Sequence, residues 1–233
     1  QSNNTAIGHN CLNKNEANYN TGLGSSALAA NTTGTQNVAV GALALDANTT
    51  GQRNTAVGYT SGSAITTGNF NAAFGSNFSL GRTTTGSYNA AFGDGALANN
   101  TTASFNVAMG QAAVHVNTTG ERNTGLGYYA LGSNTTASNN TAVGNQALFS
   151  NTTGANNVAV GALALDANTT AGSNVAVGTS SLGQNTEGFQ NTSVGASSMS
   201  ANTTGDYNVA FGSQALEANT TANRNTAIGT FSL

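Results

Sequence analysis

The stretch NVAVGALALDAN occupies residues 157–168 and recurs at residues 37–48. Looser copies fill the rest of the chain, and each begins with a five-residue tag, Asn-x-small-apolar-Gly. The tag occurs 14 times, at residues 4–8, 20–24, 37–41, 54–58, 71–75, 89–93, 106–110, 123–127, 140–144, 157–161, 174–178, 191–195, 208–212 and 225–229. Successive tags are 17 residues apart, except for one interval of 16 and one of 18. So short and regular a repeat indicates stacked structural units, and we treat residues 1–233 as one repeat domain.

The tag has the pattern of a short β-strand. Numbering each repeat from its Asn, position 2 is Thr, Val or Ala, position 3 is Ala, Gly or Ser, and position 4 is always large and apolar. Such alternation is typical of a strand, with positions 2 and 4 on one face and positions 1 and 3 on the other. We expect position 4 to be buried in the core. A second short strand is expected at positions 8 and 9, as in Ala44-Leu45, followed by an Asn-Thr-Thr-Gly corner.

Two classes of glycine behave differently. The glycine of the Thr-Thr corner is replaced by Ala at residues 103, 137, 171 and 222, so we expect no positive φ there. The glycine at position 5 is never replaced, which predicts a positive φ or a neighbouring backbone that leaves no room for a Cβ. We therefore assign structural roles to Gly8, Gly41, Gly110, Gly161, Gly178 and Gly229, and to the tag asparagines Asn37, Asn157 and Asn174.

A single repeat cannot be stable alone. Burying a position-4 residue and a Leu contributes roughly 1.5–3 kcal/mol each, whereas ordering each backbone unit costs about 1–2 kcal/mol. Stacking adds hydrogen bonds on both sides of a repeat and places like residues in columns about 4.8 Å apart. The sequence therefore predicts an all-β fold, a parallel β-solenoid of 14 coils with about 17 residues each.

The composition excludes several classes of function. Charged residues make up 6% of the chain, with five Lys or Arg and eight Asp or Glu, so no basic field exists for nucleic acid or an anionic membrane. No apolar run is long enough for membrane insertion. The histidines, His9 and His115, are about six repeats apart, and Asp46, Asp166 and Glu217 share a column but lie at least three repeats from one another. No catalytic pair or metal-ligand set converges, so we expect no enzyme, metal or cofactor.

The tag, written Asn-Val-Ala-Val-Gly or Asn-Thr-Ala-Ile-Gly, resembles the head repeats of trimeric autotransporter adhesins of the YadA type, and equally the related repeats of bacteriophage tail fibres. The resemblance covers residues 4–229. It implies a left-handed parallel β-roll with three chains side by side, in an adhesive fibre that is extracellular, on a cell surface or on a virion. The Asn-Thr-Thr-Gly corner makes the repeat longer than the usual adhesin head repeat. The chain opens on Gln1 and ends part-way through a repeat, so we interpret it as a mature product or a segment of a longer protein.

Two surface features bear on partners. Position 3 never carries a side chain larger than Ser, and the tag has no charge. The tags therefore form a flat strip of small residues, which predicts an interface. Together with the resemblance to trimeric adhesins, this predicted interface indicates a homotrimer. Aromatic and Arg residues gather immediately before the tag Asn, at Tyr19, Arg53, Phe70, Tyr88, Phe105, Arg122, Tyr207 and Arg224. This edge column has two interpretations, a packing stack or inter-chain seam, and a contact site for cell-surface glycans or a receptor.

Two alternative functions and one chemical modification accompany the adhesive-fibre hypothesis. Threonine columns on a flat solenoid raise ice binding, although that function needs Thr at alternating positions of one strand, and position 4 is never Thr. A purely spacer role is the third possibility for a repetitive filament. Nine Asn-Thr-Thr segments, which fit the Asn-x-Thr sequon, also invite glycosylation, but we prefer stacked Asn amides bonded from coil to coil. The sequons begin at Asn31, Asn48, Asn100, Asn117, Asn134, Asn151, Asn168, Asn202 and Asn219.

Overall fold

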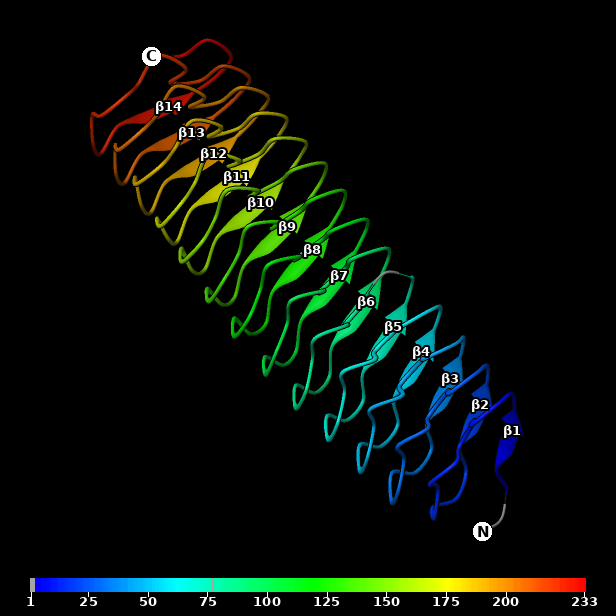
Figure 1. Ribbon diagram of the computed structural model, residues 1–233. Helices are drawn as coiled ribbons and strands as arrows, with labels where there is room; N and C mark the ends of the chain where they lie inside the picture. Colours follow the sequence, from blue (N-terminus) through cyan, green and yellow to red (C-terminus); the bar gives the residue numbers. More distant parts are fainter. Residues whose placement is uncertain (1–2, 77) are drawn as a thin grey trace. The chain divides into compact units, whose positions relative to one another are not determined.

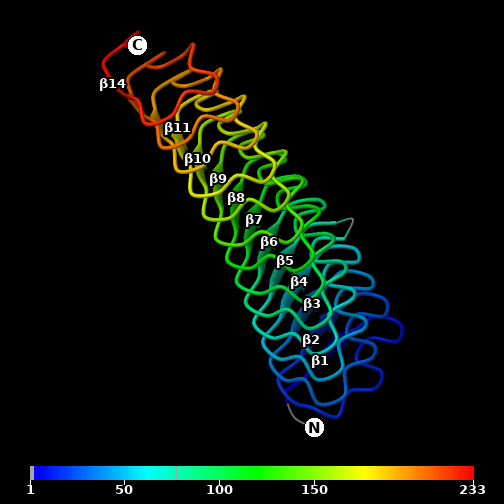
Figure 2. The same ribbon diagram turned by 90° about the vertical axis from the view of Figure 1, so that its left-hand side faces the viewer.

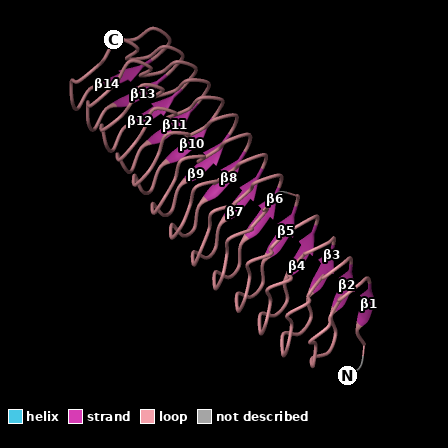
Figure 3. Ribbon diagram, in the orientation of Figure 1, coloured by secondary structure: helices cyan, strands magenta, loops and turns pink. Residues whose placement is uncertain are grey.

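The computed structural model describes residues 3–76 and 78–233, which contain fourteen three-residue β-strands and no helix (Figures 1 and 3). The chain divides into two compact units, Gln1–Thr119 and Gly120–Leu233. Unit 1 holds β1 (Thr5–Ile7), β2 (Thr21–Leu23), β3 (Val38–Val40), β4 (Thr55–Val57), β5 (Ala72–Phe74), β6 (Ala90–Phe92) and β7 (Val107–Met109). Unit 2 holds β8 (Thr124–Leu126), β9 (Thr141–Val143), β10 (Val158–Val160), β11 (Val175–Val177), β12 (Thr192–Val194), β13 (Val209–Phe211) and β14 (Thr226–Ile228). Every strand is positions 2–4 of a tag.

Within each unit the strands pair in parallel and in sequence order, and tag pairs with tag without any shift of register. In unit 1, for example, Val38 pairs with Thr55 and Ala39 with Ala56. In unit 2, Val158 pairs with Val175 and Ala159 with Ala176. The turns of each unit follow one another at regular intervals (Figure 2). The predicted parallel β-solenoid of about 17 residues per turn is therefore confirmed.

The strand faces the opposite way from our expectation. Position 3 points inward and is fully buried in most coils, as at Ala39, Ala56 and Ala159, whereas no position-4 residue is buried. Phe211 at position 4 is 58% exposed. The prediction that position 4 forms the core was wrong, and so was the prediction that position 3 forms an outward strip. The large apolar residues lie outside instead.

The core of each coil consists of the position-3 residue, the small residue of position 8 and the residue of position 9, which is usually Leu. Leu45, Leu97 and Leu165 are fully buried, as are their equivalents in nearly every coil. The strand and the turn lie close together across the interior. Ser181 Oγ, at position 8 in the turn, donates to Ser193 Oγ, at position 3 in a strand, over 2.8 Å. The interior has room for one large side chain per coil, and the turn supplies it. Position 3 must therefore stay small.

The predicted second strand at positions 8 and 9 is also wrong, because this segment consists of turns. Position 7 and position 9 both have positive φ, at 59° for Leu43 and 50° for Leu45. Position 17, the residue before the tag Asn, also has positive φ, for example 61° at Gln36. L residues rarely adopt this region, and left-handed geometry costs roughly 1–2 kcal/mol per residue. The coil-to-coil hydrogen bonds must offset that strain.

One ladder of buried asparagines runs through position 1. Asn37 Nδ2 donates to the Gly51 carbonyl at the far end of its own coil (2.8 Å), which closes the coil. Asn37 Oδ1 accepts the backbone N–H of Asn54 in the next coil (2.9 Å). The same pair of bonds recurs at Asn157 in unit 2, and both asparagines are fully buried. One side chain thus closes its own coil and attaches the next.

A second ladder runs through position 12, the Asn of the Asn-Thr-Thr corner. Asn151 Nδ2 donates to Asn134 Oδ1 of the preceding coil (3.0 Å) and to the Gly154 carbonyl (2.9 Å). Eight of the nine sequon asparagines are fully buried, and Asn219 is part-buried with its amide bonded to Asn202. The interpretation of these residues as stacked amides that bond from coil to coil is therefore confirmed.

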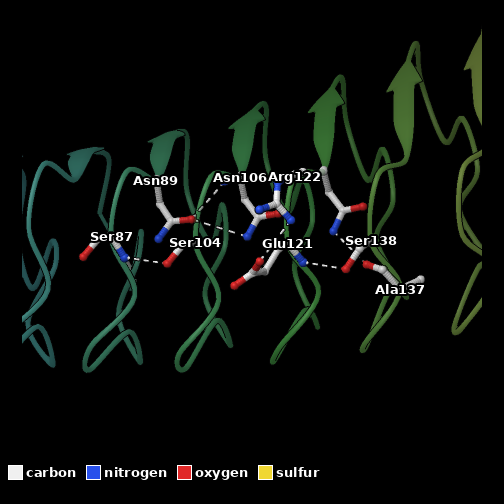
Figure 4. A network of polar contacts seen from close by, with 9 residues as sticks. Ser87, Asn89, Ser104, Asn106, Glu121, Arg122, Ala137 and Ser138 are labelled. Carbon is white, nitrogen blue, oxygen red and sulfur yellow. Dashed lines mark hydrogen bonds and ion pairs between the residues drawn. The ribbon is translucent and has the colours of Figure 1, made fainter.

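The Thr-Thr corner adds a convergent contact between coils. The backbone N–H groups of Thr32, Thr33 and Gly34, together with the Thr32 hydroxyl, all point to the Thr49 carbonyl of the next coil. Position 16 makes an outer contact of the same kind: the Ser87 N–H donates to Ser104 Oγ in unit 1, and the Glu121 N–H to Ser138 Oγ in unit 2 (Figure 4). These bonds use the backbone N–H groups that Pro would lack, consistent with the absence of Pro.

The position-12 ladder lacks Asn in two successive coils, at Ile65 and Thr83; the Thr83 hydroxyl still accepts from Asn100, so the ladder is broken at Ile65. Ile65 takes the place of Asn between Asn48 and Thr83, and its side chain is fully buried. Asn48 Oδ1 is consequently a buried acceptor without a hydrogen-bond partner. Asn31, in the neighbouring coil, makes one more bond than Asn48, because its Oδ1 accepts from Asn48 Nδ2 (2.7 Å).

The glycine of position 5 has positive φ in every coil, and in most coils the backbone of the next coil also leaves no room for a Cβ. All fourteen have φ between 121° and 154°, including Gly8, Gly41, Gly110, Gly161, Gly178 and Gly229. A Cβ built on Gly178 would lie 2.5 Å from the carbonyl oxygen of Gly195 in the next coil. The corner glycine does not have positive φ, as expected, but it is crowded too, since a Cβ on Gly51 would meet Asn48 Oδ1 and the Gly68 carbonyl. Coils with Ala at this place must therefore make room by a small shift.

The glycine classes predict unequal costs for the same substitution. We expect Gly178→Ala to lower the free energy of unfolding by about 1–3 kcal/mol more than Gly51→Ala, because only Gly178 adds backbone strain at positive φ to the steric clash. Chemical denaturation of both variants measures the difference. Equal losses would show that crowding alone, and not φ, keeps position 5 as glycine.

The interrupted ladder predicts a second difference. Asn31→Ala removes three side-chain hydrogen bonds, to Asn15, Gly34 and Asn48. Asn48→Ala removes two; it deletes one unpartnered oxygen, its own Oδ1, and leaves another, Asn31 Oδ1, so these two effects oppose each other. We expect Asn31→Ala to cost about 1 kcal/mol more in unfolding free energy. The two sites lie in adjacent coils of one unit, so each controls for the other. A larger loss for Asn48→Ala would contradict the proposed hydrogen-bond count.

Candidate functional site

The outward residues of positions 2 and 4 form an apolar surface on each unit, here called the sheet face. It contains only Thr, Val, Ala, Leu, Ile, Phe and Met and carries no charge. Phe74 and Phe92 stack on it with centroids 4.9 Å apart and planes within 4°. The residues at the centre of each unit, such as Val57 and Val160, are half-buried by their neighbours. The seven strands of a unit thus present a continuous, regular apolar surface to solvent.

The edge column, position 17, is exposed, and its aromatic rings stack on one another. Phe70 and Tyr88 have centroids 4.8 Å apart at 6°, and Tyr88 and Phe105 5.1 Å apart at 5°. The Arg53 guanidinium lies 5.1 Å over the Phe70 ring, while its Nε donates to Gln36 Oε1 (2.8 Å). Neighbouring side chains therefore cover both faces of Phe70 and Tyr88, and their edges are what solvent reaches.

In unit 2 the edge column is discontinuous. Arg224 lies 5.5 Å over the Tyr207 ring, which also meets Phe189 edge-on at 5.2 Å. Arg122 pairs with Glu121 over 3.2 Å (Figure 4). In unit 1, Tyr19 is the most exposed aromatic of the column, at 58%. The structure thus brings Arg53, Phe70, Tyr88 and Phe105 together and leaves Tyr19 separate.

Stacked rings suit packing better than sugar binding. A sugar ring needs an open aromatic face, whereas these faces are filled by the next coil at ordinary stacking distances. Cation–π contacts likewise engage Arg53 and Arg224, and an ion pair with Glu121 engages Arg122, the three side chains that were to supply donors. The geometry of the edge column favours the packing interpretation over the glycan-contact interpretation.

Two pockets, one in each unit, lie at the same place in the repeat, between position 7 and positions 10 and 11. The Arg82 pocket of unit 1 has a volume of about 240 Å³ and is lined by Phe78, Arg82, Ala98, Asn99 and His115. The Asp166 pocket of unit 2 has a volume of about 280 Å³ and is lined by Leu163, Asp166, Ala167, Ser180, Gly183, Gln184 and Ser200. Both occur where position 10 of a lining coil is Ala or Gly. Sequence reasoning missed them, although Gly183 and Ala98 in that column are visible signals.

The acidic residues of position 10 sit in partly buried surroundings. Burial raises the pKa of the Asp46 and Asp166 carboxyls, and bonds from backbone N–H groups oppose the shift. Asp46 Oδ1 is buried without a partner. Among the described residues, no three His, Cys, Asp or Glu side chains are grouped so as to hold a metal ion. No helix in the described ranges has the length and apolarity to cross a membrane.

Comparison of the chain with family models, with curated proteins and with solved structures finds no match.

The stacked rings predict a measurable stabilisation. Tyr88→Ala removes two ring pairs, each worth about 0.5–1.5 kcal/mol beyond the area that it buries, so we expect a loss of about 1–3 kcal/mol in unfolding free energy. Gln190→Ala, at the same position of another coil, should change stability by less than about 0.5 kcal/mol. Similar effects of the two substitutions would mean that the rings merely lie side by side.

Proposed function

We propose that this chain is a segment of an extracellular structural and adhesive fibre, on a bacterial surface or a virion, in which three copies pack side by side through their sheet faces. The carrying observation is the sheet face itself, which is uncharged and apolar along seven successive strands of each unit. Soluble monomers rarely expose contiguous apolar patches larger than a few hundred Å².

The periodicity of the sheet face favours a second copy of this chain as its occupant. Residues on the face repeat once per coil, at a strand spacing of about 4.8 Å. A partner that fills such a surface along its whole length needs the same spacing, and another copy has it. Small and β-branched residues at position 2, such as Ala72 and Val175, allow close approach beside the larger residues of position 4. Three copies and an adhesive role are carried over from the resemblance to trimeric adhesin heads and phage fibres.

Assembly tests this proposal directly. Light scattering at micromolar concentration should give a mass near three times 23.0 kDa. Val160→Lys places a charge in the middle of the sheet face of unit 2, and burying it would cost several kcal/mol in each copy, so this variant should be monomeric. Thr153→Lys adds the same charge at an exposed corner of a neighbouring coil and should leave the mass unchanged. A monomeric wild-type chain, or a Val160→Lys variant that still assembles, would refute the interface.

The adhesive part is tested on the same assembled sample. We expect the assembled chain to bind a subset of the sugars on a glycan array. If the edge column serves only in packing, the double variant Tyr88→Ala, Phe105→Ala should bind the same sugars. Loss of binding in that double variant, with its mass intact, would return the glycan contact to the edge column. An assembled chain that binds no glycan would have the role of a spacer.

A further inference from the structure

We propose that the Arg82 pocket binds the carboxylate of an acidic sugar, with the sugar ring against Phe78. The pocket lies where the repeat departs most from its consensus, in the coil whose spacing to the next tag is 18 residues. Carboxylate recognition follows from the pocket's own groups. The choice of a sugar as the carrier of that carboxylate rests on the proposed adhesive function.

Arg82 is the strongest reason for an anionic ligand. Its side chain is exposed, and within the described part of the chain it makes no hydrogen bond, ion pair or ring contact. Arg53, Arg122 and Arg224, by contrast, are each engaged by a neighbouring side chain. A guanidinium presents a planar fork of N–H donors that matches a carboxylate in a bidentate arrangement. None of the described lining residues of the pocket is acidic.

His115 and Asn99 supply fixed polar groups on the other side of the pocket. His115 Nδ1 lies 2.9 Å from the Gly95 carbonyl, a contact that places the proton on Nδ1. Asn99 Nδ2 donates to the His115 carbonyl (3.1 Å), which orients the amide and leaves its Oδ1 as an acceptor. The pocket therefore combines donors for an anion with acceptors for hydroxyl groups.

Phe78 gives the pocket an apolar wall. It is the eighth residue of this 18-residue coil and takes the place that position 7 has in other coils, with φ 68°; it is 54% exposed. No ring stacking involves it among the described residues, unlike the rings of the edge column. An exposed aromatic ring beside hydrogen-bonding groups suits the apolar face of a sugar ring, and about 240 Å³ limits the ligand to about one ring.

The Asp166 pocket provides an internal contrast. It lies at the same place in the repeat, but Asp166 is its charged group and Leu163 its position-7 wall. A carboxylate there would repel an anionic ligand. Equivalent places in the repeat thus offer one cationic and one acidic pocket, so we expect the preference for acidic sugars to come from the side chains of the Arg82 pocket.

Calorimetric titration of the intact chain with glucuronate, glucose and acetate tests the proposal. We expect glucuronate to bind at least tenfold more tightly than either glucose or acetate. Arg82→Gln should weaken glucuronate at least tenfold and leave glucose within twofold, whereas Arg53→Gln, outside the pocket, should change neither. Phe78→Leu should weaken the binding of both sugars; Leu43 and Leu163 occupy its position in other coils, so the substitution suits the fold.

Three results would overturn the proposal: glucuronate no tighter than glucose, acetate as tight as glucuronate, or no effect of Arg82→Gln. Melting temperature and light scattering on each variant separate this outcome from the assembly proposal. A variant that stays trimeric but no longer binds glucuronate has lost a function of the pocket and not the assembly. A monomeric wild-type chain that still binds glucuronate would refute the assembly and leave the pocket standing.

Discussion

The buried amide of the tag asparagine is the interaction on which the rest of the structure depends. Its Nδ2 closes the coil by reaching the corner carbonyl fourteen residues ahead, and its Oδ1 receives the backbone N–H of the next tag asparagine, as at Asn37. A buried amide left without these partners would cost about 1–3 kcal/mol for each unsatisfied group. No other side chain combines one donor arm and one acceptor arm at this length, so position 1 admits only Asn.

This closure fixes the length of the coil and explains its strained turns. Because the same amide fixes both ends of the coil, the chain must complete its turn within seventeen residues around an interior that has room for one Leu side chain. The return is made by residues with positive φ at positions 7, 9 and 17, most of them not glycine. Where the strain is greatest, at position 5, with φ near 130° and the next coil in van der Waals contact, only Gly remains.

Much of this arrangement was predictable from the sequence, and the failures have two physical causes. The period, the parallel register, the asparagine ladders and the glycine classes are properties of repetition, which the sequence displays directly. The side of the strand that faces inward depends on interior volume, which the repeat does not display. A large residue such as Val160 looks like core, but the space is already filled by Leu165 from the turn, so Ala159 points inward. The turns at positions 7 and 9 were missed because no glycine marks their positive φ.

The same reasoning locates where a regular solenoid acquires specificity. The columns that hold the coils together, such as the tag asparagines and the position-5 glycines, cannot vary. The rings of Phe70 and Tyr88 stack on each other, so their faces are used in packing. Position 10 varies freely because nothing in the coil depends on it, and it holds Asp46, Ala98, His115, Phe149 and Gly183 among others. A small residue there opens a pocket, and its neighbours set the charge, cationic beside Arg82 and acidic beside Asp166. Chemistry can therefore change from coil to coil in this column without any change in the fold.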